Sequence, residues 1–345
     1  MPFVTPALPG TGGSVRVSEE DFRVEELPLY EASGEGEHLY LTVEKKGRTT
    51  HEVVRELASR LSIPEREIGS AGLKDKRAVT VQRLSVPARA CPAPLELAGD
   101  GFRVVEARRH GNKLRTGHLR GNRFRIVLRG CGEGALERAR AVCAFISEHG
   151  TANLFGSQRF GQRGDNAALG AAILARDPAA ARAGRDRFLR RLALSALQSE
   201  LFNRCLAARI TDGLLSRALD GDVLRKRETG GLFVSEDPAA DTARVLSREL
   251  DPAGPLPGHS LLAAQREAHA REQAVLDEAA IDPRSFAAGG GEMEGARRPY
   301  RIPVEGLQVE ADGDALVLTL ELPRGSYAAS VLREVMKEGK ADLPE

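Results

Sequence analysis

The 345-residue chain carries 50 Lys and Arg against 49 Asp and Glu, which gives a formal net charge of +1. Its 41% hydrophobic and 29% charged residues are typical of a globular protein with buried cores, and the length suits two domains better than one. There is no apolar run of about eighteen residues, so we expect no membrane span.

The N-terminal stretch "MPFVTPALPGTGG" lacks a basic segment followed by an apolar one, so we expect no secretory signal. The four cysteines are widely spaced and form no CxxC pair, which argues against a zinc site and a disulfide framework. These features predict a protein of the reducing cytoplasm.

The first 150 residues alternate strand patterns with two helices. The apolar-polar alternation of strands occurs at 22–27, 38–47, 79–87, 101–111 and 121–130. Residues 49–62 have helical periodicity, with Thr49 or Thr50 as the cap and Glu52 in the first turn. A second helix is predicted over 134–150, where a glycine ends it.

The pattern changes after residue 150. Residues 151 to about 295 are rich in alanine and arginine, and a Pro/Gly-dense loop is expected at 251–260. Strand character returns at 304–323, which predicts a hairpin turning at "DGD". A helix capped by Ser326 is expected over 325–339. The helical patterns of the middle region lie at 167–182, 185–212 and 262–280.

This order predicts an α+β protein in which one domain is interrupted by another. Residues 1–149 and 302–345 form the predicted outer domain, with a mixed and mainly antiparallel sheet. Residues 150–301 form a mostly helical α/β insertion.

One acid stands out in the segment "AGLKDKRAVTVQ" at residues 71–82. Asp75 follows a glycine turn and is flanked by Lys74, Lys76 and Arg77. An Asx-type turn or a cap explains most aspartates in such places. The alternative is a carboxylate kept ionised by nearby cations, which serves enzymes as a nucleophile or an electrostatic stabiliser.

A basic stripe covers residues 107–130, "ARRHGNKLRTGHLRGNRFRIVLRG". From Arg103 to Arg129 there are nine Lys or Arg residues and one acid. A solvated charged face is the ordinary explanation. Here glycines alternate with the cations, and Asn122 and Phe124 share one face of a strand. An amide that reads a base beside a ring that stacks is suited to a splayed nucleotide, so the stripe favours nucleic-acid contact.

Other motifs add little chemistry. The segment "NLFGSQRFGQRGDN" at 153–166 is consistent with a tight interdomain turn that packs two rings. There is no GxGxxG and no GxxxxGKS or GxxxxGKT, so no nucleotide cofactor is predicted. No HxxxH or HExxH occurs, so no catalytic metal is predicted.

Taken in order, several of these segments resemble the TruD-type tRNA pseudouridine synthases. The resemblance covers essentially the whole chain, more loosely across the insertion, and it is most specific in two segments, "GLKDKRAVT" and "FGSQRFG". It rests also on "DFRVEE", "GEGEHLYLTVEKKGRTT", "RHGNKLRTGHLRGNRF" and "LPRGSYAASVLRE".

The resemblance implies a split pseudouridine synthase domain with the family's insertion, and roles for particular residues. The catalytic aspartate of the family falls on Asp75. The substrate pocket falls on Phe22, Asn122 and Tyr327, where phenylalanine is common at the last position; Phe124 is a further candidate ring. The expected electrostatic partner of Asp75 is either Arg16, where the family tends to have lysine, or Lys74.

The family reaction is the isomerisation of a uridine in tRNA, by resemblance at position 13, and it needs no cofactor or metal. The base would be flipped out of its stack before Asp75 attacks the ribose or the base. We expect a cytoplasmic monomer with tRNA as its partner and no membrane contact. The residues expected to contact RNA are Lys113, Arg115, Arg120 and Arg159.

Two alternatives stay open. A non-catalytic RNA-binding or RNA-chaperone module would use the same basic stripe. A carboxylate-based hydrolase would require a second acid at Asp75; Glu65 and Glu67 are the nearest preceding acids in the sequence.

Overall fold

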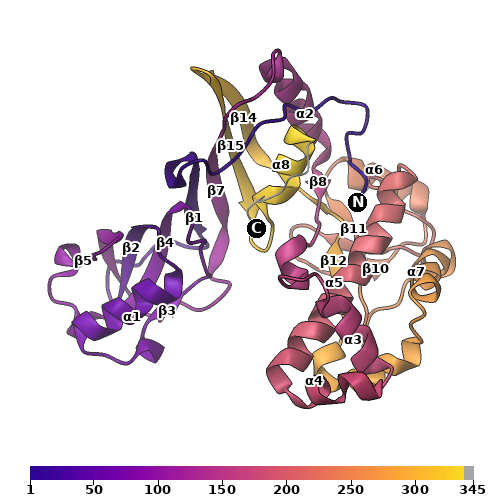
Figure 1. Cartoon of the computed structure of the whole chain (residues 1–345), viewed down its shortest axis with the longest axis horizontal. Coiled ribbons are helices and arrows are strands. Elements are labelled where there is room, and N and C mark those ends of the chain that lie inside the picture. Colours follow the sequence, from indigo (N-terminus) through magenta and orange to yellow (C-terminus); the bar gives the residue numbers. More distant parts are fainter. Residues whose placement is uncertain (338–345) are drawn as a thin grey trace. The chain divides into compact units, whose positions relative to one another are not determined.

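The computed structural model describes residues 1–337, which form two compact units (Figure 1). Among the described residues, the sheet unit consists of Leu8–Glu148 with residues 303–337, and the helical unit consists of Met1–Ala7 with His149–Ile302. The first seven residues belong to the helical unit, where Val4 packs against the core. The domain boundaries given above, 1–149 with 302–345 and 150–301, stay a prediction, because compactness alone does not define a domain. Positions 338–345 lie outside the described residues.

A nine-stranded sheet forms the centre of the sheet unit. Its order is β14-β15-β7-β1-β4-β2-β6-β5, with β3 paired to β4. Only β1 and β4 run parallel among these pairs. The predicted α+β class with a mixed, mainly antiparallel sheet is therefore confirmed. The strands are β1 (Phe22–Pro28), β2 (His38–Lys46), β3 (Gly69–Ser70), β4 (Val79–Pro87), β5 (Ala98–Gly99), β6 (Phe102–His110), β7 (Leu119–Leu128), β14 (Glu305–Asp312) and β15 (Ala315–Pro323).

Helix α1 (Thr50–Leu61) packs on the part of this sheet formed by β2, β4 and β6. Thr49 caps it: the Glu52 amide donates to the Thr49 hydroxyl oxygen over 3.1 Å, and the Thr49 amide donates to the Glu52 carboxylate. Val53 and Leu57 are fully buried against apolar side chains of the three strands. Burying each is worth roughly 1.5–3 kcal/mol, so this face fixes the helix on the sheet.

Two further helices belong mainly to the sheet unit, α2 (Ala135–His149) and α8 (Ala328–Met336). The prediction that Ser326 caps α8 was wrong. The backbone of Tyr327 is still extended, with φ −121° and ψ 134°, so Tyr327 occupies the N-cap position and Ser326 lies one residue outside it. The last two residues of the predicted helix, 338 and 339, lie outside the described residues.

The helical unit is built around the long helix α5 (Arg187–Thr211). Its apolar core includes Leu194, Leu201, Phe202 and Leu206 from this helix. The other helices are α3 (Asn166–Leu174), α4 (Ala181–Arg185), α6 (Pro238–Leu246) and α7 (Arg266–Glu278). A small sheet has the order β10-β9-β11-β12, and β8 (Thr151–Ala152) pairs with β13 (Arg301–Ile302). The small sheet consists of β9 (Val223–Lys226), β10 (Leu232–Val234), β11 (Leu250–Leu256) and β12 (Ala296–Pro299).

The loop predicted at 251–260 was wrong for its first half, because β11 occupies Leu250–Leu256. Each half of β11 pairs on one side only, its first three residues with β9 and its last four with β12. One-sided pairing accommodates two prolines that lack an amide proton. Gly254 allows the strand to pass the Tyr300 ring, since a Cβ there would lie 2.2 Å from a ring carbon.

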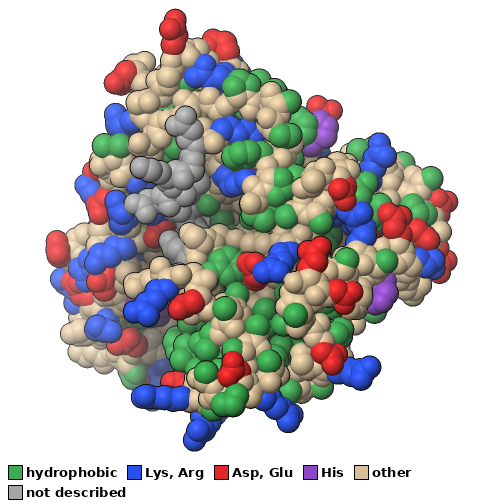
Figure 2. Space-filling view, turned by 45° about the vertical axis from the view of Figure 1, so that its right-hand side comes forward, with side chains coloured by type: hydrophobic (Ala, Val, Ile, Leu, Met, Phe, Trp, Pro, Cys, Tyr) green, Lys and Arg blue, Asp and Glu red, His purple; other side chains and the backbone are tan. Residues whose placement is uncertain are grey.

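Charges of both signs are interspersed over the face of the molecule shown in Figure 2, as the small net charge suggests. Within residues 1–337, no helix combines the length and the apolar character needed to cross a membrane.

Candidate active site

Asp75 lies on the loop that leads from β3 to β4, and it forms an ion pair with Arg16. The carboxylate side chain is 31% exposed, whereas the Arg16 side chain is only 9% exposed. Arg16 has a positive φ of 58°, an uncommon backbone conformation for a residue other than glycine. The loop thus presents a partly accessible acid whose counter-ion is buried.

Two aromatic rings lie behind the arginine. The guanidinium carbon of Arg16 is 4.5 Å from the ring centroid of Phe22, which meets Phe124 edge to face at 6.1 Å. Both rings are buried, at 3% and 7% exposure. The Arg16 Nε atom is buried without a hydrogen-bond partner among the described residues. The cation–π contact with Phe22 helps to fix the direction from which Arg16 reaches Asp75.

Lys45, on β2, binds the backbone of the Asp75 loop. It is 1% exposed, and its ammonium donates to the carbonyl oxygens of Asp75 at 2.7 Å, Arg48 at 2.8 Å and Lys74 at 3.4 Å. Burial lowers the pKa of Lys45 to about 8. The negative charge of Asp75 raises this pKa, and the positive charge of Lys74 lowers it further. A buried cation that satisfies backbone carbonyls defines the loop conformation.

Lys74 does not pair with Asp75. Its ammonium lies 2.7 Å from a carboxylate oxygen of Glu26, and both side chains are at least nine-tenths buried. The Lys74 amide donates to the Thr50 hydroxyl at 2.9 Å. The sequence left open which cation accompanies Asp75; in the structure it is Arg16, while Lys74 anchors the loop to β1.

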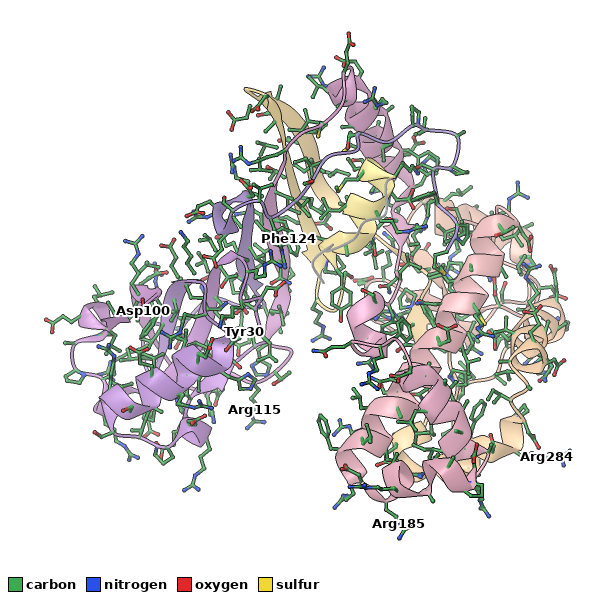
Figure 3. All side chains as sticks on the ribbon, viewed as in Figure 1. Tyr30, Asp100, Arg115, Phe124, Arg185 and Arg284 are labelled. Atoms are coloured by element: carbon green, nitrogen blue, oxygen red, sulfur yellow. The ribbon has the colours of Figure 1, made fainter. Side chains whose placement is uncertain are left out.

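Strand register brings Asn122 to the same region. On β7, Asn122 is opposite Glu26 and Phe124 is opposite Val24, so the two residues share a sheet face with Phe22. Figure 3 labels Phe124 on this strand, which pairs with β1 on one side and β15 on the other. The amide oxygen of Asn122 is buried and accepts no hydrogen bond from the described residues. It is an acceptor available to a ligand.

Tyr327 follows β15, whose end pairs with Asn122 and Gly121 through Leu322 and Pro323. Its side chain is half-buried, and the structure records no hydrogen bond or ring contact for it among residues 1–337. Of the predicted aromatic residues it is therefore the most accessible.

The four residues predicted to contact RNA differ in the partners that they already have within the protein. Arg115 is exposed at the tip of the loop after β6, and no described residue pairs with its guanidinium (Figure 3). Lys113 donates to the carbonyl oxygen of Arg66. Arg120 lies 3.5 Å from the carboxylate of Glu321. In the helical unit, the guanidinium of Arg159 donates to two serines of α5, at 3.1 Å for Ser199.

The hydrolase alternative requires a second carboxylate beside Asp75, but the contacts of Glu65 and Glu67 are with other residues. Glu65 lies 3.7 Å from Arg55, and Glu67 lines a groove with Arg66 and Lys113. Within residues 1–337, no group of three or more His, Cys, Asp or Glu residues is arranged to hold a metal ion.

Sequence reasoning missed Lys45 and Glu26. The signal for Lys45 was present, because Leu41, Val43 and Lys45 are alternate residues of β2 and all three are buried. A lysine in the buried register of a strand must find oxygen acceptors, which here belong to the Asp75 loop. Glu26 carried the same signal, because it follows Phe22 and Val24 as the next alternate buried residue of β1.

Comparison of the fold with solved structures identifies the class of protein. A solved structure from Methanosarcina mazei, assigned to tRNA pseudouridine synthase D (TruD), superposes with a TM-score of 0.79 at 25% identity. The match covers 98% of this chain and 96% of that one. The fold is thus that of a pseudouridine synthase of this type.

The sequence comparisons then give the family. The family model of tRNA pseudouridine synthase D (TruD) matches residues 1–184 and 185–335. A relative from Anaeromyxobacter sp. (strain Fw109-5), named tRNA pseudouridine synthase D, is 55% identical over 100% of this chain and 98% of its own length. A relative of the same name from Thermus thermophilus is 45% identical over 97% of this chain and 92% of its own length. The chain belongs to the TruD family of tRNA pseudouridine synthases.

Proposed function

We propose that this protein isomerises a specific uridine in tRNA to pseudouridine, with Asp75 as the nucleophile and the target nucleotide flipped out of its stack. By resemblance to the family, the uridine is at position 13. The observation that carries the proposal is the partly exposed Asp75 carboxylate, paired with buried Arg16 and held by a loop that Lys45 clamps.

The reaction requires no added atoms. The bond between ribose C1′ and uracil N1 breaks, a bond between C1′ and C5 forms, the C5 proton leaves, and N1 gains a proton. Asp75 attacks the ribose or the base and is regenerated when the new bond forms. Because uridine and pseudouridine contain the same atoms, neither an oxidant nor a group donor is needed.

The neighbouring residues supply positioning. Arg16 orients the carboxylate and balances its charge. The orphan amide oxygen of Asn122 matches the N3–H donor of uracil, which a flipped base exposes on its pairing edge. The accessible ring of Tyr327 is suited to stack on the base.

Flipping costs a few kcal/mol, which contacts with the tRNA backbone must offset. Arg115 is exposed and has no ion-pair partner among the described residues, so it is the strongest candidate for such a contact in this loop. We further propose that the protein acts as a monomer in the cytoplasm.

The experiment is product mapping. Unmodified tRNAs are incubated with the wild type, treated with carbodiimide, and read by primer extension. A new carbodiimide-dependent stop at uridine 13 supports the proposal. RNA binding and annealing without any new stop would favour the RNA-chaperone alternative, and release of free uracil or cleaved RNA would favour the hydrolase.

A further inference from the structure

A second cationic feature of the sheet unit lies away from Asp75. A groove of about 700 Å³ is lined by Arg66, Arg89, Arg109 and Lys113 together with Glu37, Glu67 and His38. These residues come from four segments: the start of β2, the turn after α1, the end of β4 and the end of β6. We call this feature the distal groove.

Hydrogen bonds to backbone carbonyl oxygens hold the four segments together. The Ala88 amide donates to the Glu37 carbonyl at 2.8 Å, and Arg109 donates to the Gly36 carbonyl at 3.1 Å. Lys113 donates to the Arg66 carbonyl. Gly36, with φ +118°, lies so close to Gly111 that a Cβ would be 2.6 Å from its Cα atom. The groove is therefore a built feature of the fold.

The cations of the distal groove differ from those of β7. Arg120 and Arg123 pair with Glu321, and Arg125 lies 3.7 Å from Asp312, so acids largely neutralise that part of the stripe. Within residues 1–337, no carboxylate forms an ion pair with Arg66, Arg89 or Arg109. Four cations against Glu37 and Glu67 leave the groove with a positive excess, which attracts polyanions.

The distal groove and Asp75 lie at opposite ends of the same strands. His38 pairs with Pro87 at the groove end, and Lys46 pairs with Val79 at the Asp75 end. Eight residue steps of strand separate the two ends, roughly 26 Å at about 3.3 Å per residue. One nucleotide cannot span that distance, so a ligand that reaches both must be an extended or folded polymer.

A loop leads from the groove end toward the Asp75 loop. It carries Lys113 at the groove and exposed Arg115 at its tip, and the Gly117 amide then donates to the Ala71 carbonyl at 2.8 Å, four residues before Asp75. The Leu114 amide donates to the buried Ser85 hydroxyl at 2.9 Å, which fixes the loop on β4. Cations thus follow a path from the groove toward the Asp75 loop.

We propose that the distal groove binds the phosphodiester backbone of the RNA whose uridine is isomerised at Asp75, through Arg66, Arg89 and Arg109. This inference rests on the proposed function for its choice of RNA. The two acids and His38, whose Nδ1 atom is buried without a described partner, are suited to the 2′-hydroxyl groups that accompany RNA phosphates. The enzyme accordingly recognises a folded RNA at two places.

The test compares two double variants, Arg66→Ala/Arg89→Ala and the control Arg103→Ala/Arg140→Ala. The control removes the same charge from exposed positions outside the groove, where Arg103 pairs with Glu44 at 2.9 Å. Binding of unmodified tRNA is measured by fluorescence anisotropy from 50 to 200 mM KCl. The Asp75→Asn substitution is present in both variants and in their parent, so that no turnover occurs.

The groove variant is expected to bind tRNA about 10- to 50-fold more weakly at low salt, with a log–log salt slope shallower by about 1.4 to 1.8, because each phosphate contact contributes about 0.7 to 0.9. The control keeps the affinity and slope of the parent within about twofold. In the background with Asp75 intact, the groove variant raises KM and leaves kcat unchanged.

Groove and control variants with equal affinity and slope would overturn the inference. The inference would also be overturned if the groove variant lowered kcat alone, while its circular dichroism and unfolding midpoint matched those of the parent. Failure of the proposed function looks different, because the wild type would then leave no pseudouridine while the binding comparison stays measurable.

Discussion

Replacing Lys45 with methionine tests how the Asp75 loop is held. Methionine keeps the apolar stem but removes an ammonium that donates at 2.7 Å and 2.8 Å to the carbonyls of Asp75 and Arg48. Hydrogen bonds to a charged group contribute about 1.5–3 kcal/mol each, so their combined loss is about 3–6 kcal/mol. Removing a buried charge offsets part of it, and we expect a net loss near 3 kcal/mol.

The assay is urea unfolding at pH 7, followed by circular dichroism, with Lys46→Met as the matched control. Lys46 is the next residue of the same strand, but its side chain is half exposed and pairs with Glu20 at the surface. Surface pairs contribute about 0–1 kcal/mol, so the control should unfold almost as the wild type does. Equal unfolding free energies for the two variants would refute the claim that Lys45 stabilises the Asp75 loop.

The same residue gives a pH dependence. Burial lowers the pKa of Lys45 to about 8 from its ordinary 10.5, so between these values the unfolded chain binds a proton that the folded chain has released. The wild type therefore gains stability relative to Lys45→Met as pH rises from about 8 to 10.5, by up to about 3 kcal/mol. A difference that is constant or shrinks with pH over this window would contradict the assignment.

Two further predictions concern the counter-ion and the thiols. Arg16→Met should lower kcat/KM for tRNA by about 10- to 100-fold, because the carboxylate loses the group that orients it, whereas Arg23→Met, at an exposed arginine paired with Glu44, should not. Equal kinetics for the two variants would contradict this role. Burial raises the pKa of Cys143 and Cys205 to about 12, so iodoacetamide at pH 8 should label neither until the protein unfolds. Peptide mass spectrometry that finds either thiol labelled in the native protein would show it to be accessible.

Periodicity was sufficient for most of the sheet unit. Strands β1, β2, β4, β6 and β7 and helices α1 and α2 lie within one or two residues of their predicted bounds, because in each of them one face is more deeply buried than the other. The hairpin of β14 and β15 turns at Gly313 as expected. Short-range patterns therefore determined these elements.

The helical unit was harder because tertiary contacts override local signals there. Pro252 and Pro255 argued for a loop, yet the one-sided pairing of β11 accommodates both. Short strands such as β9 and β10 carry too few residues for a period to be seen. Ion pairs that bury Arg209 with Asp222 join segments that no sequence pattern connects.

For the site, the family resemblance selected Asp75, while its counter-ion needed the structure. Both Arg16 and Lys74 were candidates, and the distinction depends on Glu26, which reaches Lys74 from β1. Strand register predicts that Asn122 and Phe124 share a face, but not that the Asn122 amide oxygen lacks a partner among the described residues. Such details depend on packing between strands far apart in the sequence.

The most direct measurement of the central claim is release of tritium from tRNA transcribed with uridine labelled at C5, since isomerisation expels that proton. The wild type should release tritium into water in proportion to the tRNA modified. Asp75→Asn should bind the same tRNA with wild-type affinity and release none above background. Release by Asp75→Asn at the wild-type rate would show that the carboxylate at position 75 is not the nucleophile.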